Sequence, residues 1–117
     1  LPISKITECV NFAEEQTKNL GLRAPMVGHL GDGNFHVLLP YDPLQKETYQ
    51  KIREFSDLLI KKTLELNGTI TGEHGVGLHK KAYLLKEHGD NIPLMKLIKR
   101  SIDQNNIMNP GKIFDLN

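Results

Sequence analysis

Apolar residues return every three or four positions in two long stretches of the chain, which predicts two amphipathic helices. The first helix is expected to be capped by Ser4 and closed by Gly21. The second is expected to open at Asp42, with a proline in its first turn, and to end at the Asn67-Gly68 pair. The apolar positions that define the two faces are Ile6, Val10, Ala13 and Leu20 in the first helix and Ile52, Phe55, Leu59 and Leu66 in the second.

Two strands are predicted between these helices, at residues 23–30 and 34–40, joined by an Asp-Gly dipeptide of the kind that favours a two-residue hairpin turn. Such a turn places His29 directly opposite His36, with Cβ atoms roughly 4.5–5.5 Å apart. The opposite side of the second strand is then the one that faces the core. It carries Phe35, Val37 and Leu39.

The rest of the chain is predicted to form a short β-branched strand at residues 69–71, a glycine-rich turn, and two helices at 78–87 and 93–103. In the last helix Leu94, Leu97 and Ile98 are expected to face inward. This order of elements predicts an α+β fold, with helices packed on one face of a small antiparallel sheet and a helical C-terminal part.

Composition narrows the possible partners. Fifteen basic and fourteen acidic residues leave a formal charge of +1, so the totals do not favour nucleic acid or an anionic membrane. No apolar run approaches the roughly 18 residues needed to cross a bilayer. The single cysteine, Cys9, excludes an internal disulfide and a cysteine-based zinc cluster and is expected to be a buried structural thiol. Because the chain starts at Leu1 without an initiator Met, we expect a fragment or a processed piece.

The histidines around the predicted turn are candidate metal ligands. Opposed across a hairpin, His29 and His36 could share one ion, and Glu73 could add a carboxylate oxygen. Two imidazoles and a carboxylate leave coordination positions open, as in a catalytic site. The alternative is an ordinary cross-strand pair of histidines without a metal. The tight turn and the later Glu73-His74 pair favour the metal.

Glycines on both sides of His74 allow the backbone to bend, so that Glu73 and His74 could point to the same side. His74 is therefore a candidate general base, and a surface loop histidine is the alternative. The nearby Lys80 and Lys81 are expected to form a solvated face that at most helps to attract an anionic substrate.

Three motifs in this order resemble a known family. They are residues 29–36 (HLGDGNFH), 68–77 (GTITGEHGVG) and 108–112 (MNPGK), and residues 2–6 fit as well. Together they resemble the C-terminal part of FAD-linked 2-hydroxy acid dehydrogenases, the group of D-lactate dehydrogenase and the glycolate oxidase D subunit. The resemblance implies that residues 1–117 are the C-terminal part of a substrate- and metal-binding domain with ferredoxin-like character, whose N-terminal FAD-binding domain is not in this chain.

The resemblance also assigns roles to residues. His29, His36 and Glu73 would hold a divalent zinc, manganese or iron ion that binds the substrate, and His74 would take the proton of its hydroxyl group. Asn109 would lie near FAD in the closing Asn-Pro-Gly turn. The partners implied are a small 2-hydroxy acid, the FAD-binding domain and an electron acceptor that the sequence does not identify.

Leu38 bears on the substrate, because the 2-hydroxyglutarate enzymes of this group have a polar residue at that place. An apolar residue there favours D-lactate or glycolate as the substrate. The isolated fragment is expected to be inactive, because the flavin carries the redox chemistry. The expected location is the cytoplasm or the periphery of the inner membrane, mitochondrial in a eukaryote. Two other functions fit the same residues: a metal-dependent hydrolase, and a metal-binding module without catalysis.

Overall fold

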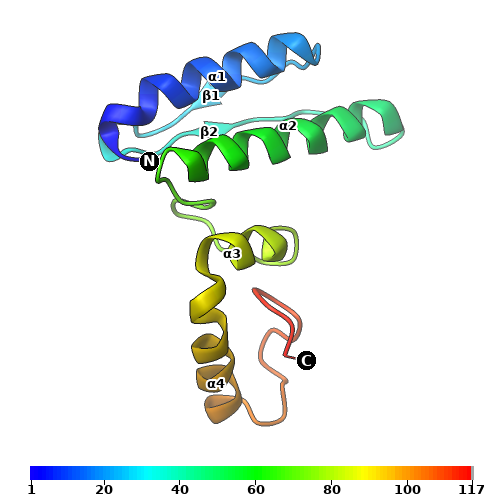
Figure 1. Ribbon diagram of the computed structural model, residues 1–117. Helices are drawn as coiled ribbons and strands as arrows, with labels where there is room; N and C mark the ends of the chain where they lie inside the picture. The colour runs from blue at the N-terminus through cyan, green and yellow to red at the C-terminus, as the bar shows by residue number, and fades with distance from the viewer. Residues whose placement is uncertain (117) are drawn as a thin grey trace. The chain divides into compact units, whose positions relative to one another are not determined.

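Thr69 and Ile70 mark the boundary between two units of the structure, a computed structural model that describes residues 1–116 (Figure 1). Unit 1 comprises Leu1–Thr69 and contains two long helices and a hairpin. Unit 2 begins at Ile70 and contains two shorter helices followed by an irregular C-terminal segment. Helices together with a small antiparallel sheet confirm the predicted α+β class.

Helix α1 (Ile6–Asn19) follows a 3-10 turn, η1 (Ile3–Lys5). Ser4 does not cap the helix as predicted, because it lies inside η1 and the N-cap position falls on Lys5, which makes no side-chain cap bond. The predicted stop at Gly21 is confirmed: this residue adopts a φ of +66°, a conformation that glycine tolerates at no steric cost.

The hairpin is shorter than predicted, with strands β1 (Met26–Val27) and β2 (His36–Val37). Met26 pairs with Val37 and Val27 pairs with His36. The predicted two-residue turn and the predicted pairing of His29 with His36 are therefore wrong. Eight residues, 28–35, separate the strands.

A second 3-10 turn, η2 (Leu30–Asp32), explains the longer loop. The carbonyl oxygen of His29 accepts hydrogen bonds from the N–H groups of Asp32 at 2.8 Å and Asn34 at 3.3 Å, so the loop uses this backbone group in place of a strand ladder. Gly33 ends η2 with a φ of +77°. The Asp-Gly dipeptide thus serves a helical turn and does not form a two-residue hairpin.

Helix α2 (Lys46–Glu65) begins later than predicted. The carboxylate of Asp42 accepts the N–H of Leu44 at 2.9 Å, which makes a separate turn before the helix in place of an N-cap. The predicted Asn-Gly stop is confirmed, because the N–H of Gly68 closes the last turn onto the carbonyl of Thr63 at 2.8 Å.

The core of unit 1 lies between α1 and α2, which run side by side, with the hairpin along one side of them (Figure 1). Cys9 is fully buried and its Sγ lies 3.8 Å from the hydroxyl oxygen of Thr63. Burial raises the pKa of the Cys9 thiol, as expected for a structural cysteine. The other buried apolar residues of these helices and their ends are Ile6, Ala13, Phe55 and Leu66.

Unit 2 contains helices α3 (Lys81–His88) and α4 (Ile92–Ile102), joined by the 3-10 turn η3 (Gly89–Asn91). The predicted strand at residues 69–71 is not formed, and Ile70 lies at a bend. Helix α3 ends at His88, and Gly89 is its C-cap residue, in a right-handed helical conformation that leads into η3.

The apolar side of α4 faces outward, contrary to the prediction. The side chains expected to be buried are more than half exposed: Leu94 at 58%, Leu97 at 60% and Ile98 at 51%. The polar side is occupied by the C-terminal segment, which runs back beside α4 (Figure 1) and receives hydrogen bonds from Lys99 and Arg100. None of the helices in residues 1–116 is both long and apolar enough to span a bilayer.

Candidate functional site

In unit 1 the two candidate histidines occupy different settings. His36 is half-buried on β2 opposite Val27, whereas His29 is exposed at the start of the loop, just before η2. The two imidazoles therefore could not bind one ion as a pair of residues opposed across the strands. His29 would have to reach it from the loop, and the ligand roles of both residues stay predictions.

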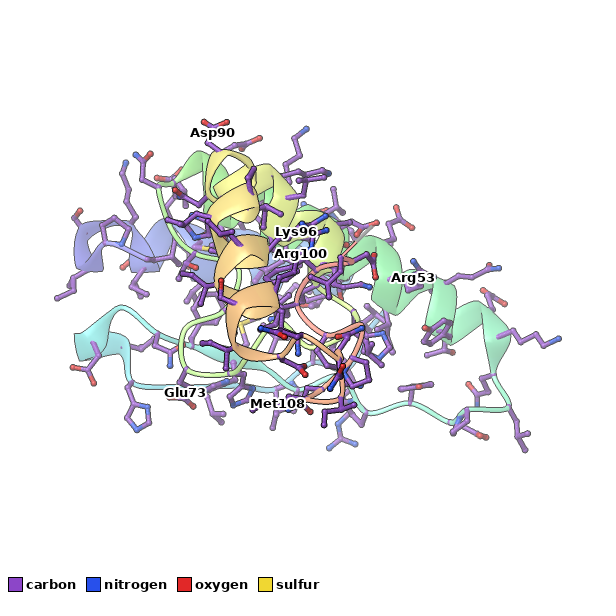
Figure 2. All side chains as sticks on the ribbon, turned by 90° about the horizontal axis from the view of Figure 1, so that it is seen from below. Arg53, Glu73, Asp90, Lys96, Arg100 and Met108 are labelled. Atoms are coloured by element: carbon purple, nitrogen blue, oxygen red, sulfur yellow. The ribbon has the colours of Figure 1, made fainter. Side chains whose placement is uncertain are left out.

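In unit 2 the second candidate pair lies on the glycine-rich loop, residues 71–77, here called the Glu-His loop; Figure 2 shows Glu73 on it. The Nε2 atom of His74 lies 3.6 Å from a carboxylate oxygen of Glu73, and both side chains are exposed. In an extended strand neighbouring side chains point to opposite faces, so this approach requires the predicted bend. The hydroxyl group of Thr71 donates to the carbonyl oxygen of His74 across the bend.

Helix α3 and the residue before it fix the start of the Glu-His loop. The N–H of Ile70 donates to the carboxylate of Glu87 at 3.1 Å, and the ammonium group of Lys80 donates to the carbonyl oxygen of Ile70 at 2.9 Å. Ile70 itself is buried. Burial lowers the pKa of Lys80, so the prediction of a solvated lysine is wrong here.

The C-terminal segment fixes the end of the loop. Gly77 has a φ of +57°, and its carbonyl oxygen accepts the N–H of Ile113 at 2.8 Å. Lys81 binds the same segment, with its ammonium group 3.2 Å from the carbonyl oxygen of Gly111 and 2.6 Å from the carboxylate of Asp115. Lys81 is therefore not part of a solvated face either.

Asn109 occupies the turn that the sequence predicts. Its φ is +50°, and its carbonyl oxygen accepts the N–H of Lys112 at 3.3 Å, which closes a four-residue turn through Pro110 and Gly111. The side chain is exposed. The turn is confirmed, and the proposed contact of Asn109 with FAD stays a prediction.

Sequence reasoning missed Asp103, which organises the chain just before this turn. Its carboxylate accepts the N–H groups of Ile107 and Met108, both at 2.9 Å, and also the ammonium group of Lys99. The Lys99 hydrogen bond, followed by those from the backbone, holds the pKa of Asp103 below its usual value although burial opposes this. The four-residue spacing from Lys99 on a helix was the available signal.

A cavity of about 450 Å³ opens in unit 2 beside α3. Its walls combine apolar and charged side chains: Leu78, His79, Lys81, Ala82, Leu85, Ile92, Lys96, Phe114 and Asp115. The candidate residues Glu73, His74 and Asn109 are not among these lining residues. The chemistry suggested by the motifs therefore does not coincide with this cavity.

The donor types offered by the candidate residues fit a divalent metal. Imidazole nitrogen and carboxylate oxygen are ligands that zinc, manganese and iron accept. Within unit 2 the 3.6 Å separation leaves the Glu73 carboxylate and the His74 imidazole close enough to act on one bound molecule. Such an arrangement suits a Lewis acid next to a base.

Comparisons with known proteins agree with the motifs. The chain is 39% identical to the probable mitochondrial D-lactate dehydrogenase of Danio rerio and 41% identical to the mitochondrial D-lactate dehydrogenase (cytochrome) of Kluyveromyces lactis. Each alignment covers 99% of the present chain. It is 36% identical to the glycolate oxidase subunit GlcD of Bacillus subtilis over 97% of its residues.

The chain spans about a fifth to a quarter of the length of these curated relatives: 24%, 20% and 24%, respectively. The family described as "FAD linked oxidases, C-terminal domain" matches residues 1–113. Since this match covers nearly the whole chain, the protein belongs to the family of FAD linked oxidase C-terminal domains.

Proposed function

We propose that this chain is the C-terminal catalytic part of an FAD-dependent, metal-assisted dehydrogenase that oxidises a D-2-hydroxy acid to the 2-oxo acid. The observation that carries the proposal is the Glu73-His74 pair, 3.6 Å apart on a loop that is held at both ends. The family of the chain and the names of its relatives supply the reaction class.

In this proposal His29, His36 and Glu73 hold the divalent ion. His74 takes the proton of the substrate hydroxyl at an imidazole nitrogen and passes it to solvent, to which its exposed side chain has access. When bound, the ion lowers the pKa of the hydroxyl group and FAD supplies the acceptor for the hydride of the substrate carbon. Asn109 contacts the flavin from the closing turn.

Leu38 supports a small substrate. Its N–H donates to the carbonyl oxygen of Pro25 at 2.9 Å, and its side chain is half exposed, two residues beyond His36. An apolar side chain offers no hydrogen bond to a second carboxylate. We therefore infer that D-lactate or glycolate is the substrate.

The proposed location in the cell rests on the names of the relatives. Those from Danio rerio and Kluyveromyces lactis are named mitochondrial, so in a eukaryotic cell we propose a mitochondrial enzyme. We also propose a peripheral position at the inner membrane.

The test is anaerobic stopped-flow reduction of FAD by D-lactate in the full-length protein. His74→Ala should slow the limiting rate of reduction by roughly 10²–10⁴-fold, the usual contribution of a positioned general base. His79→Ala is the matched control, because it removes another exposed histidine five residues away. A His74→Ala rate equal to that of the control would show that His74 is not the base. A wild-type protein that binds FAD without oxidising any 2-hydroxy acid would contradict the function itself.

A further inference from the structure

The start of α3 carries two consecutive lysines that bind segments far apart in the sequence. Lys80 reaches back ten residues to the carbonyl oxygen of Ile70, and Lys81 reaches forward 30 residues to the carbonyl oxygen of Gly111. The first contact lies where the Glu-His loop begins. The second lies inside the turn that carries Asn109.

We propose that Lys80 and Lys81 are positioning residues that hold the Glu-His loop and the Asn109 turn in one fixed arrangement. This inference rests on the proposed function, since it assigns the two lysines to the site that Glu73, His74 and Asn109 would form. Both lysines act through backbone carbonyl groups, so neither is a catalytic residue.

The Lys80 contact is one half of a two-sided anchor. Glu87 accepts the N–H of Ile70 while Lys80 donates to its carbonyl, so both polar backbone groups of a buried residue are bound by side chains. Lys80, the N-cap residue of α3, and Glu87, in the last turn of the helix, lie on the same side because both bind Ile70. A bend that is not part of a sheet ladder needs such partners for its buried backbone groups.

The Lys81 contact binds the C-terminal segment at two points, the carbonyl of Gly111 and the carboxylate of Asp115. Between them, Ile113 donates its N–H to Gly77 at the end of the Glu-His loop. Ile113 has a φ of +68°, a conformation that is unfavourable for a β-branched residue. The surrounding contacts must therefore compensate for a local cost, and Lys81 supplies two of them.

The two lysines thus give the two site-bearing segments a common anchor. The Glu-His loop is fixed at Ile70 through Lys80 and at Gly77 through Ile113, and Ile113 is part of the segment that Lys81 holds. A misplacement of about 1 Å in a catalytic group can cost a large factor in rate. Loss of either lysine should therefore slow the reaction by a large factor, whereas the free energy of unfolding of the whole protein should change only slightly.

The experiment uses the full-length enzyme with Lys80→Met and Lys81→Met, which keep most of the unbranched side chain but remove the ammonium donor. Lys86→Met is the matched control, because Lys86 is an exposed lysine on the same helix whose ammonium group lies over the ring of Tyr83. The first readout is amide hydrogen exchange. We expect roughly fivefold faster exchange or more in residues 70–77 for Lys80→Met and in residues 109–115 for Lys81→Met, because each loses a hydrogen bond to its anchor.

The second readout is the pH profile of the limiting rate of flavin reduction by D-lactate. A loss of folded enzyme lowers the amount of flavin that is reduced and leaves the limiting rate and its apparent pKa values unchanged, whereas a displaced base changes both. We expect both lysine variants to reduce the limiting rate by roughly tenfold and to shift the profile, and Lys86→Met to do neither.

Glu87→Met provides a second test of the anchor if Lys80→Met does not fold, because it removes the other partner of Ile70. Exchange in residues 70–77 that matches the Lys86→Met control in both variants would overturn the Lys80 assignment, and unchanged exchange in residues 109–115 would overturn that of Lys81. Hydrogen exchange does not depend on the substrate. A wild-type protein without dehydrogenase activity would therefore refute the proposed function separately from the anchor.

Discussion

Val27 on β1 pairs with His36 on β2, which leaves His29 two residues beyond the end of the ladder. The position of the His36 side chain is therefore fixed by paired strands. His29 instead belongs to a loop whose carbonyl groups accept hydrogen bonds from N–H groups of the same loop. If both are metal ligands, they differ in rigidity. His36 would be the fixed donor, and His29 would close onto the ion from the loop.

The metal proposal predicts that the full-length protein contains one divalent ion per chain and that the ion is lost when its ligands are replaced. His36→Ala and Glu73→Gln should each reduce the metal content to a small fraction of the wild-type value. The loss of any one of the three ligands greatly lowers the affinity for the ion. Elemental analysis after dialysis measures this. His79→Ala should retain the metal, and a His36→Ala protein with full metal content would contradict the assignment.

The long helices were the easiest part of the fold to predict from the sequence. Gly21 and the Asn67-Gly68 pair end α1 and α2 as expected, because Gly21 and Asn67 adopt the positive φ that glycine and asparagine tolerate best at a helix end. The starts of both helices were misplaced. Ser4 and Asp42 each had the right residue type for a cap, but the chain uses one in a 3-10 turn and the other in a separate turn.

Gly28 provides a test of the hairpin that carries the histidines. A Cβ atom added there would lie 2.5 Å from the Cα of Phe35 and 2.6 Å from the carbonyl oxygen of Asn34. Gly28→Ala should therefore force the loop open and destabilise the protein by roughly 1–3 kcal/mol. We also expect weaker metal binding, because the clash lies next to both His29 and His36.

Gly31→Ala is the control for this prediction, because an added Cβ at Gly31 meets nothing within 4 Å. Its unfolding free energy and metal content should stay close to those of the wild type. Thermal unfolding and elemental analysis of the two variants side by side measure both effects. Equal behaviour of Gly28→Ala and Gly31→Ala would mean that the two sides of the loop do not approach each other as closely as described.

The candidate residues were found from the sequence, but the contacts that position them were not. Lys80, Lys81 and Asp103 bind backbone groups of remote or irregular segments, and neither helical nor strand periodicity records such contacts. For the same reason the prediction for α4 failed. Its apolar side was assumed to face the core, whereas hydrogen bonds from Lys99 and Arg100 hold the C-terminal segment against the polar side.

Phe55 should control stability without affecting the chemistry. It is 1% exposed and lies on α2, a helix that carries none of the residues assigned to the reaction. Phe55→Ala should lower the free energy of unfolding by roughly 3–5 kcal/mol, whereas Leu44→Ala, at a side chain that is 88% exposed, should change it by less than about 0.5 kcal/mol. Chemical denaturation measures both. In the fraction of Phe55→Ala that remains folded, the limiting rate of flavin reduction should equal that of the wild type.

Asp103 should make the stability of unit 2 sensitive to acid. Its hydrogen bonds with Lys99, Ile107 and Met108 favour the ionised carboxylate and hold its pKa below the ordinary value of 3.8. The unfolded chain therefore takes up the proton at a higher pH than the folded chain. The stabilisation is complete well above pH 3.8 and is lost as the pH falls through the lower pKa of the folded state.

Asp103→Asn should remove this contribution, because the amide lacks the negative charge that Lys99 pairs with. The variant should unfold at a lower temperature than the wild type at pH 7, and the difference should shrink as the pH falls from 3.8 through the lower pKa of the folded state, where the wild-type carboxylate also becomes neutral. Thermal unfolding followed by circular dichroism between pH 2 and 7 would measure both trends. Asp57→Asn, at an exposed position on α2, should follow the wild-type curve. If the difference between Asp103→Asn and the wild type stayed constant down to the lowest pH, the carboxylate charge would not be what holds Ile107 and Met108 at the end of α4.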